Sequence, residues 1–290
     1  MQSGDALTRL RYRYLPDHLI GEILTKRWID NAIPFLTLII VGAVFGGLVP
    51  GFFSAGALGD LGRQFAEFGL IVIGLTIVMI SGGIDLSVAS VFALSVLLSL
   101  IGLNVEGWPV ALSAVAVLAL GAVCGAVNGY LIGYLRLRAF LTTLVTLIIF
   151  RSIYDIVFLK MSTDIIANIP DSAFWDYLGS GTVLGLPFSL IVTAIIALAW
   201  HIVLSRMRPG WRLTAVGGAR RSAYNAGIRV RRTVFLAYVW SSLLTSLAGF
   251  LFAARIGSTG ADTGVGLEVS ALTAAVLGCN SLGGGRGSVG

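Results

Sequence analysis

Long apolar runs constrain this chain more than any other feature of its sequence. Several of them reach about 20 residues, which a helix needs to cross the roughly 30 Å hydrocarbon core of a bilayer. Only 12% of the residues are charged, about half of the 25% or so that is usual in soluble domains. The chain is therefore expected to fold in a membrane. The eight apolar runs cover approximately 32–50, 66–81, 86–103, 109–134, 139–159, 187–205, 233–254 and 268–280.

Helices are the expected form of these runs, because backbone groups in lipid must find hydrogen-bond partners within their own segment. The alternating pattern of a membrane β-barrel, in stretches of about ten residues, is absent. We expect an all-α, polytopic transmembrane helical bundle with about eight spans, some of them discontinuous. Residues 1–31 are polar and basic and are expected to form a cytoplasmic N-terminal segment, with residues 32–290 as the transmembrane domain. The first apolar run starts too late for a cleavable signal peptide and is expected to remain as an anchor.

Most of the 20 Lys and Arg residues lie in three clusters, at 9–27, 136–138 and 206–232. If every run crosses the membrane, these clusters fall on one side, and the positive-inside rule makes that side cytoplasmic. The N-terminus is therefore expected in the cytoplasm. The same topology accounts for the basic charge, so we expect no nucleic-acid partner.

The sequence lacks the motifs of an enzyme or a metal protein. It contains no P-loop and no G-x-S-x-G or H-E-x-x-H motif. Its two cysteines, Cys124 and Cys279, match no metal-ligand spacing. We expect no catalytic residues, no metal and no bound cofactor in this chain. The glycine run at 283–287 leads to no further span, which is expected if C-terminal spans are missing.

Residues 81–87 interrupt the apolar stretch between the second and third runs with two glycines and an aspartate. Glycine suits a backbone excursion, and aspartate is a favoured helix N-cap. One interpretation is a plain turn in which Asp85 caps the next helix. The other is a discontinuous helix at membrane depth whose exposed backbone lines a polar cavity.

Two further features lie within the spans. Gly121, Gly125, Gly129 and Gly133 form one stripe, which favours close packing of helices. Asn128, beside the stripe, is expected to bond a neighbouring helix or to face a polar pathway. Arg151 and Asp155 are four residues apart and can meet on one helix face, as a structural ion pair or a functional one.

The basic segment 206–232 contains eight residues between Gly217-Gly218 and Gly227, which is enough for a short helix. Such a helix could dock into a partner and pass its motion to the spans. The alternative is a solvated loop.

Four stretches resemble bacterial ABC importer permeases of the ribose/galactose/arabinose/xylose class. Residues 82–90 read GGIDLSVAS, close to that family's GGIDLSVGS. Residues 210–228 are similar to its cytoplasmic loop, and 264–284 to its "AAVVLGGTSLxGG" region. Phe140 to Thr143 with Arg151 fit its fifth-span pattern. Departures include Ala89 for a glycine and Ala219 for an asparagine.

The resemblance implies a permease subunit, with residues 32–290 as the permease domain, in the bacterial inner membrane. Its implied partners are a cytoplasmic ABC ATPase that binds ATP and magnesium, a periplasmic sugar-binding protein, a second permease subunit and the lipid bilayer. The substrate-pathway candidates are Gly82, Gly83, Asp85, Ser87, Ser90 and Asn128. The implied ATPase-coupling residues are Gly217, Gly218, Ala223, Tyr224, Gly227 and Ile228.

Two other functions remain open from the sequence. A permease for branched-chain amino acids or nucleosides would share the architecture, although the GGIDLSV run favours sugars. A secondary transporter without an ATPase is expected to carry more intramembrane carboxylates than Asp85 and Asp155.

Overall fold

The structure is a computed structural model that describes residues 27–167, 172–278, 284, 285 and 287. The chain divides between Leu58 and Gly59 into two compact units. The first unit contains helix α3 (Arg27–Leu48) and a turn that leads into helix α4 (Ala55–Ile80). In the turn, Gly51 adopts a positive φ of 79°, a conformation that glycine takes without steric cost.

The second unit holds the rest of α4 and all later elements. In chain order these are α5 (Val88–Leu100), the π-helical turn η1 (Ile101–Val105), α6 (Val110–Gly129), the π-helical turn η2 (Tyr130–Tyr134), α7 (Ala139–Ala167), α8 (Ala173–Ser180), the antiparallel strand pair β1 (Thr182–Val183) and β2 (Leu186–Pro187), α9 (Phe188–Arg206), α10 (Arg208–Gly218), α11 (Arg220–Asn225), α12 (Val230–Ile256) and α13 (Leu267–Leu277).

The all-α class is confirmed, and each of the eight apolar runs falls on a helix. The expected count of eight spans is not. Within the described residues, six helices are long and apolar enough to cross a membrane. Two further apolar stretches, residues 35–48 of α3 and residues 267–277, are shorter than a span.

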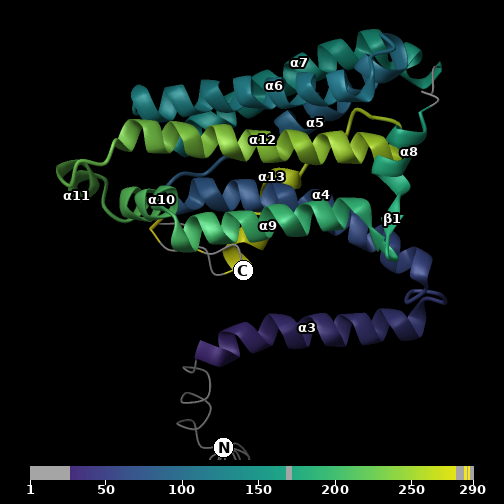
Figure 1. Cartoon of the computed structure of the whole chain (residues 1–290), viewed down its shortest axis with the longest axis horizontal. Coiled ribbons are helices and arrows are strands. Elements are labelled where there is room, and N and C mark those ends of the chain that lie inside the picture. The colour runs from purple at the N-terminus through teal and green to yellow at the C-terminus, as the bar shows by residue number, and fades with distance from the viewer. Residues whose placement is uncertain (1–26, 168–171, 279–283, 286, 288–290) are drawn as a thin grey trace, which may run out of the picture. The chain divides into compact units, whose positions relative to one another are not determined.

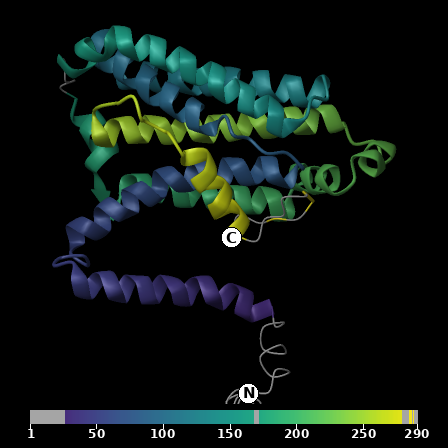
Figure 2. The same ribbon diagram turned by 180° about the vertical axis from the view of Figure 1, so that it is seen from behind.

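Helix α12 is the centre of the second unit. In Figures 1 and 2 it lies between α6 and α7 on one side and α4 and α9 on the other. Its most extensive contacts are with α6 and α5. Burial follows this arrangement. In an 18-residue apolar stretch of α5 and η1, 83% of the residues are buried, whereas in the corresponding stretch of α9 only 11% are buried. Helix α5 is therefore an interior helix, and α9 offers its apolar surface to the surroundings.

The glycine stripe of α6 lies against the backbone of α12. A Cβ atom at Gly125 would come within 2.6 Å of the carbonyl oxygen of Tyr238, and one at Gly129 within 2.7 Å of that of Phe235. A Cβ at Gly133 would meet the carbonyl oxygen of Arg231 at 2.8 Å. These glycines therefore let the two helices approach backbone to backbone. They also fix the pairing as antiparallel, with the end of α6 beside the start of α12.

Candidate functional site

The site is built around the interruption between α4 and α5. Helix α4 ends at Ile80 and α5 begins at Val88, and Gly82 between them has a φ of 82°. Ser87, not Asp85, is the N-cap residue of α5. The Asp85 carboxylate instead accepts hydrogen bonds from the backbone N–H of Ser87 at 3.1 Å and from its hydroxyl at 2.6 Å. Asp85 thus holds the N-cap residue Ser87 in place and is not itself the cap.

The interruption lies deep within the bundle. The hydroxyl of Ser241 donates to the Asp85 carboxylate at 3.2 Å, and that of Tyr238 donates to the carbonyl of Ile84 at 3.2 Å. Ser241 lies three turns after Val230, the first residue of α12, which is about 16 Å along the helix axis. Asp85, its partner, therefore lies at the same depth from the N-terminal end of α12. This depth favours the interpretation as a discontinuous helix over a turn at the bundle surface.

A chain of buried polar groups continues from Ser87 into two more helices. Asn128 of α6 donates to the Ser87 hydroxyl oxygen at 2.7 Å, and Thr146 of α7 donates to the Asn128 side-chain oxygen at 2.8 Å. Ser90 donates to the carbonyl of Leu147 at 2.7 Å. Together with Ser241, these bonds connect α5, α6, α7 and α12 at one level.

The structure thus brings together Asp85, Ser87 and Asn128, three of the residues predicted to line the substrate pathway. All three are fully buried, so in this conformation they hold helices together. A substrate would reach them only after the bundle opens, and their role in a pathway stays a prediction. Sequence reasoning missed Thr146, Tyr238 and Ser241, because a lone Ser, Thr or Tyr in an apolar span carries no spacing signal.

Three glycine-containing segments meet beside the interruption, in what we call the glycine junction: Gly82, Gly217 at the end of α10, and Gly284 with Gly285. A Cβ at Gly217 would overlap the carbonyl oxygen of Ile80. That oxygen accepts a hydrogen bond from the N–H of Gly285 at 3.1 Å. The junction therefore joins α10 to the end of α4 through main-chain atoms.

The segment 206–232 contains two helices. The predicted short helix is confirmed as α11, and the positive φ of 80° at Gly227 follows it. Sequence analysis did not foresee that 208–218 would form a further helix, α10. Ala223 of α11 is buried, whereas Tyr224 is 72% exposed. Figure 1 shows α11 at an extremity of the second unit. Of the predicted coupling residues, Gly217 thus faces the bundle and Tyr224 faces outward, while Ile228 is half-buried.

Besides the pair of Asp60 and Arg63 within α4, two ion pairs lie toward the other end of the bundle. The predicted pair of Arg151 and Asp155 is confirmed at 3.4 Å, and Arg151 also donates to the carbonyl of Thr263 at 2.6 Å. It thereby connects α7 to the loop after α12. The bidentate pair of Arg255 with Glu67, at 2.7 and 2.8 Å, joins α12 to α4. The sequence analysis did not identify this second pair, although two ionisable residues inside separate apolar spans are a usable signal.

Many membrane transport proteins are helical bundles with interrupted helices beside buried polar groups. Residues 57–289 match the family described as the permease component of branched-chain amino acid transport systems. The ribose import permease protein of Escherichia coli strain K12 is 34% identical over 268 residues, which is 91% of this chain and 82% of that protein.

Two further similar proteins are also named as sugar permeases. The ribose import permease protein of Bacillus subtilis strain 168 is 34% identical over 256 residues, 88% of this chain and 78% of its own. The D-allose transport system permease protein of E. coli K12 is 31% identical over 262 residues, 88% of this chain and 77% of its own. No solved structure matches the chain. The chain belongs to this family of transport permeases and is a multi-pass inner-membrane protein.

The buried polar chain predicts an asymmetry between two substitutions in α6. Asn128→Ala removes one hydrogen bond from each of Ser87 and Thr146, and we expect it to cost about 1–3 kcal/mol of stability. Ser113→Ala is the control, because the buried Ser113 hydroxyl has no hydrogen-bond partner among the described residues. Thermal unfolding of the purified proteins in detergent measures both. Equal stability of the two variants would contradict a structural role for the Asn128 bonds.

Proposed function

We propose that the chain is the membrane-spanning permease subunit of an ATP-driven ABC importer that carries a monosaccharide across the bacterial inner membrane by alternating access. The observation that carries this proposal is the set of relatives named as ribose, allose, galactofuranose and fructose permeases, each matching most of this chain. The family description refers to branched-chain amino acids, which makes such an amino acid the second candidate substrate.

The test is uptake by proteoliposomes that contain the permease with its ATPase and binding protein. We expect ATP-dependent accumulation of at least one of radiolabelled ribose, allose or fructose, and none of leucine. Omission of the binding protein should abolish uptake. Accumulation of leucine but of no sugar would overturn the substrate class, and sugar uptake without ATP would overturn the energy source.

The proposed orientation places the N-terminus and the segment 206–232 in the cytoplasm. There, α11 would meet the ATPase, which would bind ATP and Mg²⁺. A second permease subunit, expected to be another copy of this chain, would complete the pathway, and a periplasmic binding protein would deliver the sugar. The basic residues at 136–138 and 206–232 support this orientation, since η2, α10 and the start of α12 gather at one end of the unit.

The glycine junction supports a route for the motion. Helix α10 ends against the carbonyl of Ile80, immediately before the interruption. Movement of α10 and α11 by the ATPase would therefore act directly on the end of α4. We propose that the bundle then opens and lets the sugar bond to Asp85, Ser87, Ser90 and Asn128. Polar partners are required because a sugar loses its water hydrogen bonds on entry.

Tyr224→Arg tests the contact with the ATPase. Tyr224 is 72% exposed, so the substitution should leave folding intact. A cation at the centre of a docking surface should lower sugar uptake by more than about tenfold. The binding protein should then no longer stimulate ATP hydrolysis. Leu135→Arg, at an exposed position of the 135–138 loop, is the control and should retain both activities. Normal stimulation in Tyr224→Arg would refute the proposed contact.

Gly217→Ala and Gly218→Ala form a matched pair for the glycine junction. A methyl group at Gly217 would overlap the Ile80 carbonyl, whereas at Gly218 the nearest atom is the Cα of Gly285 at 3.9 Å. We expect Gly217→Ala to cost about 1–3 kcal/mol through overpacking and to reduce uptake per folded molecule. Gly218→Ala should behave as wild type. Uptake and thermal unfolding are measured on both, and indistinguishable results would exclude the junction as a motion route.

A further inference from the structure

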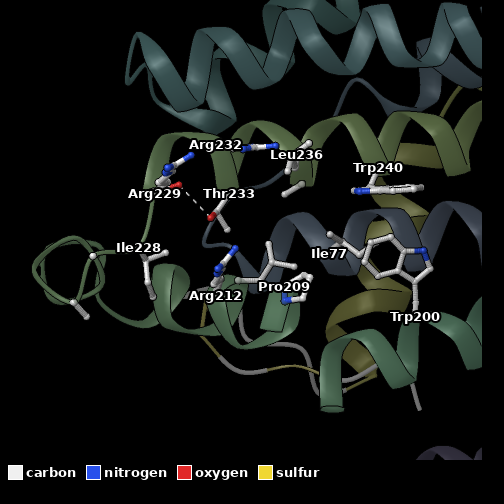
Figure 3. Close-up of a pocket in the computed structure, with 14 residues that line it drawn as sticks. Ile77, Trp200, Pro209, Arg212, Ile228, Arg229, Arg232, Thr233, Leu236 and Trp240 are labelled. Carbon is white, nitrogen blue, oxygen red and sulfur yellow. Dashed lines mark hydrogen bonds between the residues drawn. The ribbon is translucent and has the colours of Figure 1, made fainter. Parts of the chain in front are cut away.

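A cavity of about 690 Å³ lies among α9, α10 and α12, with Ile77 of α4 on its wall. This volume falls in the range of about 300–1,000 Å³ that is usual for small-molecule sites. Figure 3 shows that its lining is segregated: three arginines lie toward one end and two tryptophans at the other. The lining residues used below are Arg212, Arg229, Arg232, Leu236, Trp200 and Trp240.

The arginine end of the cavity has no neutralising acid in the described structure. Arg212, Arg229 and Arg232 take part in none of the ion pairs found among the described residues. The sequence contains no Asp or Glu at all between residues 177 and 261. Three guanidinium groups around one cavity repel one another, and an anion from outside the chain would relieve that repulsion. The planar guanidinium matches the geometry of phosphate in particular.

The other end of the cavity is apolar and lies deeper along α12. Arg232, Leu236 and Trp240 are four residues apart in turn, so they share one helix face. The eight residues from Arg232 to Trp240 span about 12 Å. There the Trp240 ring packs edge to face against Trp200, with ring centroids 5.3 Å apart. Along one wall, therefore, the cavity changes from cationic to aliphatic to aromatic.

We propose that this cavity binds one anionic phospholipid, with its phosphate among Arg212, Arg229 and Arg232 and an acyl chain along Leu236 toward the tryptophan pair. The segregated lining selects an amphiphile. A neutral sugar would leave the arginines without a counter-charge, and a free phosphate would leave the apolar end unused. Basic pockets between membrane helices are suited to such head groups.

The experiment titrates the purified full chain in detergent with phosphatidylglycerol and with phosphatidylcholine, and counts bound lipid by native mass spectrometry. We expect phosphatidylglycerol to bind on the order of tenfold more tightly. Replacing Arg212, Arg229 and Arg232 together by Gln should bring the two lipids to within about twofold. Replacing Arg206, Arg208 and Arg221 by Gln is the control: it removes the same charge from exposed residues that do not line the cavity, and it should keep the preference.

A second pair of variants tests the apolar end. Trp240→Ala should weaken phosphatidylglycerol binding, whereas Trp211→Ala, at a 63% exposed tryptophan that does not line the cavity, should not. Thermal unfolding verifies that each variant is folded. Equal loss of lipid preference in the two arginine triples would overturn the proposal, as would displacement of the lipid by glycerol phosphate at equal concentration. Unchanged lipid binding with loss of ATPase co-purification only in the cavity triple would assign these arginines to the protein partner instead.

Discussion

Non-helical backbone inside a membrane protein must satisfy its hydrogen bonds away from water, and the segment between α4 and α5 meets this requirement with side chains from other helices. Asp85 bonds Ser87 and accepts from Ser241, and Tyr238 donates to the Ile84 carbonyl. The two bonds from Tyr238 and Ser241 also fix the position of α12 against the interruption. The arrangement of α5, α6, α7 and α12 therefore depends on this polar centre as well as on close packing, because apolar burial alone does not drive helices together in lipid.

The second requirement of the bundle is that helix backbones lie close together, and glycine allows this in two places. Along α6, glycines spaced by four let a whole helix face lie against α12. At the glycine junction, single glycines from distant segments let α10 reach the end of α4. The stripe explains how α6 and α12 stay together. The junction places the end of α10, the helix before α11, next to the interruption.

The sequence could predict the helices and the interruption, because apolar length and a Gly-Gly-Ile-Asp break are local properties. It also predicted the Arg151–Asp155 pair, whose members are one turn apart. It could not predict that Asn128 would bond Ser87, since partners 41 residues apart are matched only by tertiary packing. The count of eight spans stays a prediction, because six of the described helices are long and apolar enough to cross a membrane and the apolar stretches at 35–48 and 267–277 are shorter. The arginine-lined cavity could not be predicted from the sequence either, because its walls come from four helices.

The Glu67–Arg255 pair fixes one point of α4, so that the helix can tilt about this point. Glu67 is anchored to α12 by two hydrogen bonds, and Ile80 is held at the other end by α10. About 20 Å of continuous helix separates the two points. A sideways displacement at Ile80 would thus tilt α4 about Glu67. The tilt would be largest beside Asp85 and smallest at the ion pair, so one end of the bundle could open while the other stays closed.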